Sequence, residues 1–245
     1  MARRTKEEAL ATRERLLDAA ELLFQSQGVS QTTLQQIAQA ADATRGAVYW
    51  HFKDKADLFN AMMDRVTLPL EAANRAGIAE AGEQPLVGVE RSMLFVLRLV
   101  ATDPQVRRVF DIATRKIEYT DDMTPVRQRH LASRRTFLSE LESALRDSAR
   151  REQHKLPIPA ATAAQGLHAL FVGLIEDWLL DPSAFDLVAG GKRLLHVYLG
   201  GLGFDHKIAP GDVPASGSGS QNLRSPSQTD GTKAKGRPVP SRSIC

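Results

Sequence analysis

The chain has 245 residues, a net charge of +3 and 42% hydrophobic residues, which is enough for one or two globular domains. Leu, Ala, Arg and Glu dominate and β-branched runs are rare, so the composition favours an all-α fold. The single cysteine, Cys245, excludes an internal disulfide framework and fits a cytoplasmic protein, while Arg98 and Glu176 interrupt the longest apolar stretches and exclude a membrane span.

The first predicted helix lies between Thr5 and Gly28. Thr5 is the expected N-cap, with Glu8 as its reciprocal capping partner, and Gly28 supplies a left-handed stop. Apolar residues recur between them at helical spacing, which predicts one buried face. That face consists of Leu10, Leu16, Leu17, Ala20, Leu23 and Phe24.

Two short helices follow. Thr33 is the expected cap of the first, and Gln36 completes its capping box. Its inner face holds Leu34, Ile37, Ala38 and Ala41. Asp42 stands in the turn where a left-handed residue is needed, a place that Asp tolerates, and Thr44 then caps the third helix.

The third helix carries "TRGAVYWHF" and is about two turns long. Val48 and Phe52 are four residues apart, so they share the face that packs on the first two helices. Tyr49, Trp50 and His51 then point outward. Two short helices joined by a tight turn form a helix-turn-helix, whose second helix enters a major groove. The alternative is a plain helical hairpin, but an exposed aromatic cluster is costly without a partner.

Longer helices are expected after residue 54. Asp54 caps a helix that starts at Lys55 and contains Pro69. Further helices are predicted near 85–101, 104–117, 123–150, 160–180 and 184–202. Residues 205–245 are rich in Gly, Ser and Pro, so we predict a disordered basic tail; its "KAKGR" run is either a weak nucleic-acid contact or simply solvated.

These patterns resemble the TetR/AcrR family of repressors. "TTLQQIAQAADATRGAVYWHFKDKADLF" is similar to the family's DNA-binding signature, and "MARRTKEEALATRERLLDAAELLF" is similar to the opening of the branch that represses multidrug efflux pumps. Asp42 departs from the glycine that is usual in the family's turn. The resemblance implies an all-α homodimer. With the helix pattern it predicts a helix-turn-helix domain over 1–54 and a ligand-binding and dimerisation domain over 55–204, and composition alone sets apart the tail over 205–245.

The resemblance also implies which residues contact double-stranded operator DNA. Thr33 and Thr44 can meet phosphates, Arg45 can read guanine, and Trp50 can pack on a sugar or a thymine methyl. The positions that match the family's DNA contacts are Thr33, Thr44, Arg45, Gly46, Tyr49, Trp50, His51 and Lys55.

The same resemblance places dimerisation on residues 160–180 and 184–202, with Ala169, Gly173, Leu180, Leu194, Leu195 and Tyr198 as candidates and with Gly166 and Gly173 permitting close approach. A cavity for a small hydrophobic inducer is expected between the central helices. For each candidate the alternative is ordinary core packing. The candidates are Met93, Val96, Phe110, Thr114, Phe171, Val172, Ile175 and Glu176.

The sequence shows no sign of catalysis. "GGK" lacks the rest of a phosphate-binding loop, and the six histidines are scattered, so we expect no cofactor and no metal site. The favoured hypothesis is a repressor of a multidrug efflux operon, released from a palindromic operator by a hydrophobic molecule. A ligand-independent or metabolic regulator of the same fold, or an enzyme, is the alternative.

Overall fold

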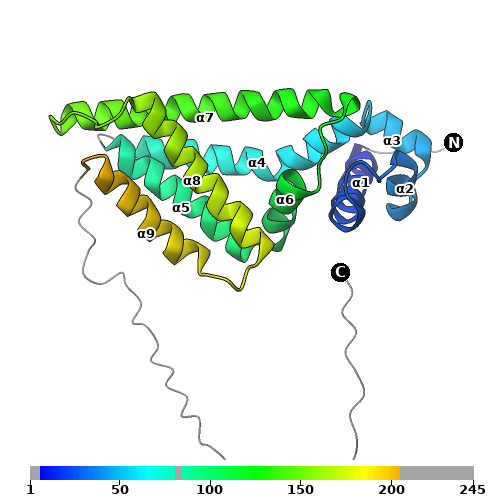
Figure 1. Ribbon diagram of the computed structural model, residues 1–245. Helices are drawn as coiled ribbons and strands as arrows, with labels where there is room; N and C mark the ends of the chain where they lie inside the picture. Colours follow the sequence, from blue (N-terminus) through cyan, green and yellow to red (C-terminus); the bar gives the residue numbers. More distant parts are fainter. Residues whose placement is uncertain (1–5, 81–83, 205–245) are drawn as a thin grey trace, which may run out of the picture. The chain divides into compact units, whose positions relative to one another are not determined.

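The computed structural model describes residues 6–80 and 84–204, and side chains only outside 73–83. The regular secondary structure of these residues consists of helices joined by turns and loops, as predicted (Figure 1). The predicted cap Thr5 and the predicted tail over 205–245 lie outside the described residues. No helix within the described ranges is both long and apolar enough to span a bilayer.

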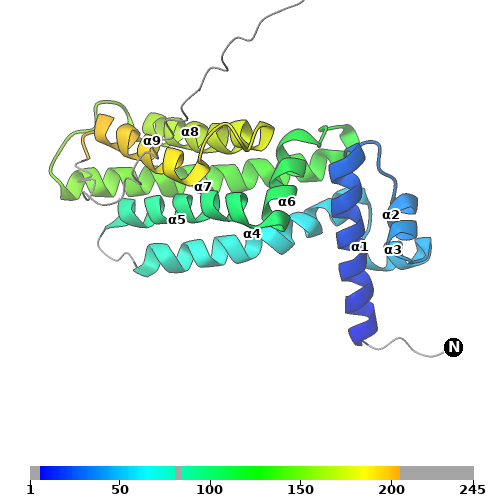
Figure 2. The same cartoon turned by 90° about the horizontal axis from the view of Figure 1, so that it is seen from below.

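Three helices pack together at the N-terminal end: α1 (Lys6–Gln27), α2 (Leu34–Ala40) and α3 (Arg45–His51). Leu16, Phe24, Ile37 and Val48 are completely buried between them, as the periodicity predicted. Leu10 was predicted to be buried, but it is 52% exposed. The reason is visible in Figure 2, where the first turns of α1 extend beyond α2 and α3.

The remaining helices form the larger part of the fold. They are α4 (Lys55–Glu80), α5 (Pro85–Thr102), α6 (Pro104–Arg115), α7 (Thr124–Arg151), α8 (Ala160–Leu180) and α9 (Leu187–Gly201), with a 3-10 turn η1 (Asp121–Met123) before α7. α5 is central, since it packs against α4, α6, α7, α8 and α9. In Figure 2, α8 and α9 lie on the side opposite to α4.

One apolar cluster connects the N-terminal helices to the larger part. It runs from Leu17 and Phe24 through Phe59 of α4 to Ile112 of α6. A second cluster joins α5, α7, α8 and α9 around Leu145. α1 therefore shares a continuous core with α4 and α6. Because the core is closely packed, a shift of α4 or α6 also displaces α1.

Candidate DNA-binding surface and ligand cavity

Side-chain caps fix the entry of both short helices. The Thr33 hydroxyl accepts a hydrogen bond from the backbone N–H of Gln36 at 3.2 Å, and the Gln36 side chain accepts one from the Thr33 N–H at 2.8 Å. Thr44 caps α3 by accepting from the Ala47 N–H at 3.1 Å. Asp42 has a φ of 49°, which is the left-handed turn conformation that the sequence required. The expected helix-turn-helix is present.

The outward face of α3 carries its aromatic residues. Trp50 is 72% exposed and Tyr49 is 50% exposed, while Val48 beside them is fully buried. The Arg45 guanidinium donates to the Tyr49 hydroxyl at 3.4 Å and lies 5.5 Å from the centre of its ring. This hydrogen bond raises the pKa of Arg45 further. A cation and two exposed rings therefore share one face of α3.

Two other residues complete this face. A Cβ built at Gly46 would meet only the Thr44 hydroxyl, at 3.8 Å, so no internal packing requires a glycine there. The His51 ring is half-buried and stands edge-on to Trp50, with 4.5 Å between the ring centres. We define Thr33, Thr44, Arg45, Gly46, Tyr49, Trp50 and His51 as the α3 surface.

Lys55, an expected DNA contact, makes hydrogen bonds within the chain. Its ammonium group donates to three backbone carbonyl oxygens of the loop between α1 and α2: those of Val29 at 3.1 Å, Thr32 at 3.3 Å and Ser30 at 3.4 Å. All three N–H bonds of an ammonium group are then engaged. Lys55 thus holds the loop that leads into α2, and it lies outside the α3 surface.

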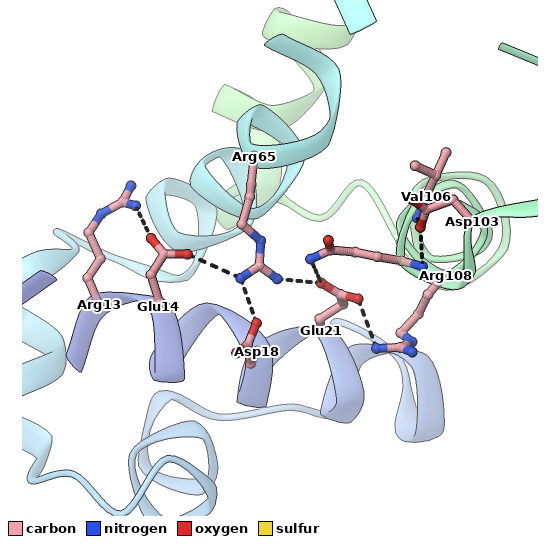
Figure 3. A network of polar contacts seen from close by, with 9 residues as sticks. Arg13, Glu14, Asp18, Glu21, Arg65, Asp103, Val106 and Arg108 are labelled. Carbon is pink, nitrogen blue, oxygen red and sulfur yellow. Dashed lines mark hydrogen bonds and ion pairs between the residues drawn. The ribbon is translucent and has the colours of Figure 1, made fainter. Parts of the chain in front are cut away.

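An acidic residue buried in α1 joins the N-terminal helices to the larger part (Figure 3). The side chain of Glu21 is 2% exposed and forms ion pairs with Arg65 of α4 at 2.5 Å and Arg108 of α6 at 2.9 Å. Gln105 of α6 donates to the same carboxylate at 3.2 Å. Arg65 also pairs with Asp18 at 2.6 Å. We call Glu21, Arg65, Arg108 and Gln105 the Glu21 network.

The sequence reasoning missed this network, although a signal was present. Glu21 lies four residues after Leu17 and three before Phe24, on the face of α1 that was predicted to be buried. A carboxylate at such a position needs a cationic partner, because an unpaired buried charge is unfavourable.

A cavity of about 580 Å³ lies between α4, α5, α6, α7 and α8. Seven of the eight candidate ligand residues line it: Val96, Phe110, Thr114, Phe171, Val172, Ile175 and Glu176. Met93 does not line it. It lies one turn before Val96 on α5 and is 1% exposed in the second apolar cluster, with Leu145 and Leu167, so for Met93 the core alternative holds.

The sequence reasoning overlooked two walls of this cavity. α4 contributes Met63, Thr67, Leu70 and Glu71, and α7 contributes His130, Ser133, Arg134 and Phe137. The α7 residues repeat at spacings of three and four, so they share one helical face. That face is mostly polar, which is also the pattern of a solvated surface; periodicity alone could not distinguish the two.

The polar part of the wall has a defined electrostatic character. Burial lowers the pKa of His168 below its ordinary value of 6.5, and the nearby charges of Arg134 and His130 lower it further. Burial raises the pKa of Tyr119, although Arg127 opposes that shift. The imidazole of His168 and the phenol of Tyr119 are therefore neutral at neutral pH.

In the described part of the chain, no three His, Cys, Asp or Glu side chains are placed to hold a metal ion.

Comparison with known proteins agrees with this arrangement. Residues 16–62 match the family described as "Bacterial regulatory proteins, tetR family", and residues 84–204 match "MAATS-type transcriptional repressor, C-terminal region". The chain belongs to the TetR family. The predicted resemblance is confirmed by both matches.

Curated relatives of this TetR-family chain match along nearly their whole length. It is 37% identical over 212 residues to the HTH-type transcriptional repressor BepR of Brucella suis biovar 1 (strain 1330), an alignment that covers 86% of the chain and 99% of BepR. It is 38% identical over 193 residues to the HTH-type transcriptional regulator TtgR of Pseudomonas putida, with 79% of the chain and 92% of TtgR covered.

Solved structures give the same picture. NalD, the secondary repressor of the MexAB-OprM multidrug efflux pump in Pseudomonas aeruginosa, is 37% identical with a TM-score of 0.72, covering 80% of this chain and 98% of NalD. A SmeT–triclosan complex is 32% identical with a TM-score of 0.71, covering 84% and 98%.

Helices α8 and α9 of this TetR-family chain leave one apolar face open. Leu180 is 75% exposed and Val197 is 73% exposed, and a Cβ at Gly173 would meet no atom within 4 Å. Other candidates for dimerisation serve the interior of the chain. Gly166 makes room for the Tyr198 hydroxyl, which donates to a carbonyl of α8, and Leu195 is buried.

Proposed function

We propose that this TetR-family chain is a dimeric repressor that binds a palindromic operator through the α3 surface and leaves it when a hydrophobic molecule enters the cavity. The regulated operon encodes a multidrug efflux pump, as with NalD. The observation that carries the proposal is the combination, in one chain, of an exposed aromatic recognition helix and a cavity walled by α4 and α6.

Each residue of the α3 surface has a role that its chemistry supports. The Thr33 and Thr44 hydroxyls and the polar groups of Tyr49 and His51 hold the phosphate backbone, which fixes the register of the helix. Arg45, whose side chain rests on the Tyr49 ring, reads a guanine edge. Gly46 allows close approach of the helix to the bases. Lys55 acts indirectly by holding the loop before α2.

The open face of α8 and α9 supports a symmetric dimer. Leu180, Leu194 and Val197 are exposed on α8 and α9, and the open space beyond Gly173 lets two helix backbones approach closely. Such a two-fold contact presents two recognition helices to two half-sites.

Release requires a ligand that prefers one of two conformations, because equal affinity for both would shift nothing. α4 and α6 form walls of the cavity and also carry Arg65 and Arg108 of the Glu21 network. A ligand that moves these helices therefore moves α1 and the α3 surface. A coupling of ~2 kcal/mol would weaken operator binding by about 30-fold.

The test is Val172→Trp, which fills the cavity, with Leu131→Trp as the control because Leu131 is exposed on α7 outside the cavity. Operator affinity is measured by fluorescence anisotropy on a duplex selected from random sequence, with and without a hydrophobic inducer, and dimerisation by sedimentation. We expect only the Val172 variant to lose the response. A Val172→Trp dimer that binds inducer normally and is still released from DNA would place the ligand elsewhere.

A further inference from the structure

The cavity wall formed by α7 contains a cation, Arg134, whose side chain is held by a neutral acceptor. Arg134 is half-buried, and its guanidinium donates to the Gln165 amide oxygen at 2.8 Å. Among the described residues, no Asp or Glu oxygen forms an ion pair with it. A guanidinium that faces a partly enclosed cavity with only a neutral acceptor keeps most of its capacity to bind an anion, and its planar fork matches a carboxylate.

Aromatic rings stand beside this cation. The ring of Phe137 on α7 lies near two rings of α8: its centre is 5.9 Å from that of His168 and 6.4 Å from that of Phe171. All three rings and Arg134 line the same cavity. Since His168 is neutral, it does not provide a competing positive charge, and its imidazole can donate or accept a hydrogen bond. The wall thus combines a flat apolar surface with one cationic end.

We propose that the inducer is an aromatic acid whose ring packs on Phe137 and Phe171 and whose anionic group binds Arg134. This inference rests on the proposed function and specifies the ligand of the same cavity. It narrows the expectation of a small hydrophobic inducer to one that carries a negative charge.

The acidic residues of the cavity do not reverse this preference. Glu71 and Glu176 also line it, but both side chains are exposed to solvent. Water screens exposed charges strongly, whereas a half-buried guanidinium acts through a medium of lower dielectric constant. An anion in the cavity therefore gains more from Arg134 than it loses to the two glutamates.

Three probes of the same size test the charge preference in the full-length chain: 2-naphthoate, 2-naphthamide and 2-naphthylmethylammonium. Calorimetry at neutral pH should show naphthoate binding about tenfold more tightly than the amide, as expected for one charge-assisted interaction. The ammonium probe should bind more weakly than the amide. Equal affinity of the acid and the amide, stronger binding of the ammonium probe, or no binding of naphthoate would each overturn the proposal without use of a variant.

Arg134→Gln locates the effect, with Arg135→Gln as the control because this change removes the same charge from the exposed side of α7. Arg134→Gln should bind naphthoate as weakly as the amide, and its affinity for the amide should be unchanged. Arg135→Gln should keep the tenfold ratio of naphthoate affinity to amide affinity. A ratio retained in Arg134→Gln would overturn the assignment to Arg134. If the amide releases the operator at the same concentration as the acid, the charge preference fails while the proposed function stands. If neither probe nor any other cavity ligand releases it, the proposed function fails.

Discussion

Removing the charge of Glu21 should destabilise the protein by an amount that the Glu21 network sets. In Glu21→Gln the side chain keeps its shape, but Arg65 and Arg108 lose a shared carboxylate. Breaking a fully buried pair costs about 3–5 kcal/mol. Here both arginines retain contact with water, and Arg65 keeps Asp18 at 2.6 Å. We therefore expect a loss of about 2 kcal/mol, near the value of a hydrogen bond to a charged group.

Thermal unfolding of the protein, followed by circular dichroism at fixed protein concentration, measures this loss. For a chain of this size 2 kcal/mol corresponds to a decrease in Tm of about 4–8 °C. Glu14→Gln is the matched control, because Glu14 lies on the same helix, is 51% exposed at its side chain and meets Arg65 at 3.4 Å. It should change stability by less than about 0.5 kcal/mol.

The same variant also tests transmission between the cavity and DNA. If the Glu21 network carries the shift of α4 and α6 to α1, Glu21→Gln should reduce the inducer-dependent change in operator affinity, while Glu14→Gln leaves it intact. A Glu21→Gln protein that unfolds at the wild-type temperature and keeps the full inducer response would refute the reasoning, since the buried carboxylate would then support neither stability nor coupling.

Three further changes have defined outcomes. Lys55→Met should lower the free energy of unfolding in urea by about 2 kcal/mol, because three carbonyl oxygens lose a cationic donor. The slope of log operator affinity against log salt concentration should stay the same. A slope reduced by about one unit would show that Lys55 contacts a phosphate. Gly46→Leu should leave Tm and dimerisation unchanged, since a Cβ there would meet only the Thr44 hydroxyl, at an ordinary contact distance of 3.8 Å. Operator binding measured by anisotropy should be lost, and retained binding would remove Gly46 from the α3 surface. The pKa of His168 is lowered in the folded chain, so the protein should lose stability as the pH falls below 6.5, where the unfolded chain takes up the proton first. His168→Asn should show a smaller loss between pH 7 and pH 5, and an identical pH profile would contradict the lowered pKa.

Local signals predicted the N-terminal helices well because they depend on neighbours in sequence. The Thr33 cap needs only Gln36 three residues later, and the turn needs only a residue such as Asp42 that adopts a positive φ. Proline and capping residues likewise predicted the bounds of α5–α9 to within about three residues.

Contacts between distant elements were harder to predict. Lys55 was expected to contact DNA, and no local pattern predicted that its ammonium would bind carbonyl oxygens 23–26 residues earlier in the chain. Met93 and Val96 are both apolar residues one turn apart on α5, so the sequence does not distinguish them. Only the packing of α7 and α8 places Met93 in the core and Val96 in the cavity wall. Arg134 shows the converse case, because a charged residue on a polar face carries no sign of the cavity that it lines.

Each chain carries its own ligand cavity, so the proposed dimer contains two equivalent cavities that act on one bound operator. When ligand binding at two sites shifts one conformational equilibrium, the fraction of operator bound by the repressor depends on ligand concentration more steeply than one site allows. The Hill coefficient can then reach two. A gradual rise in ligand concentration then produces a sharper onset of transcription. How sharp the onset becomes depends on how strongly one filled cavity loosens the helices of the empty protomer.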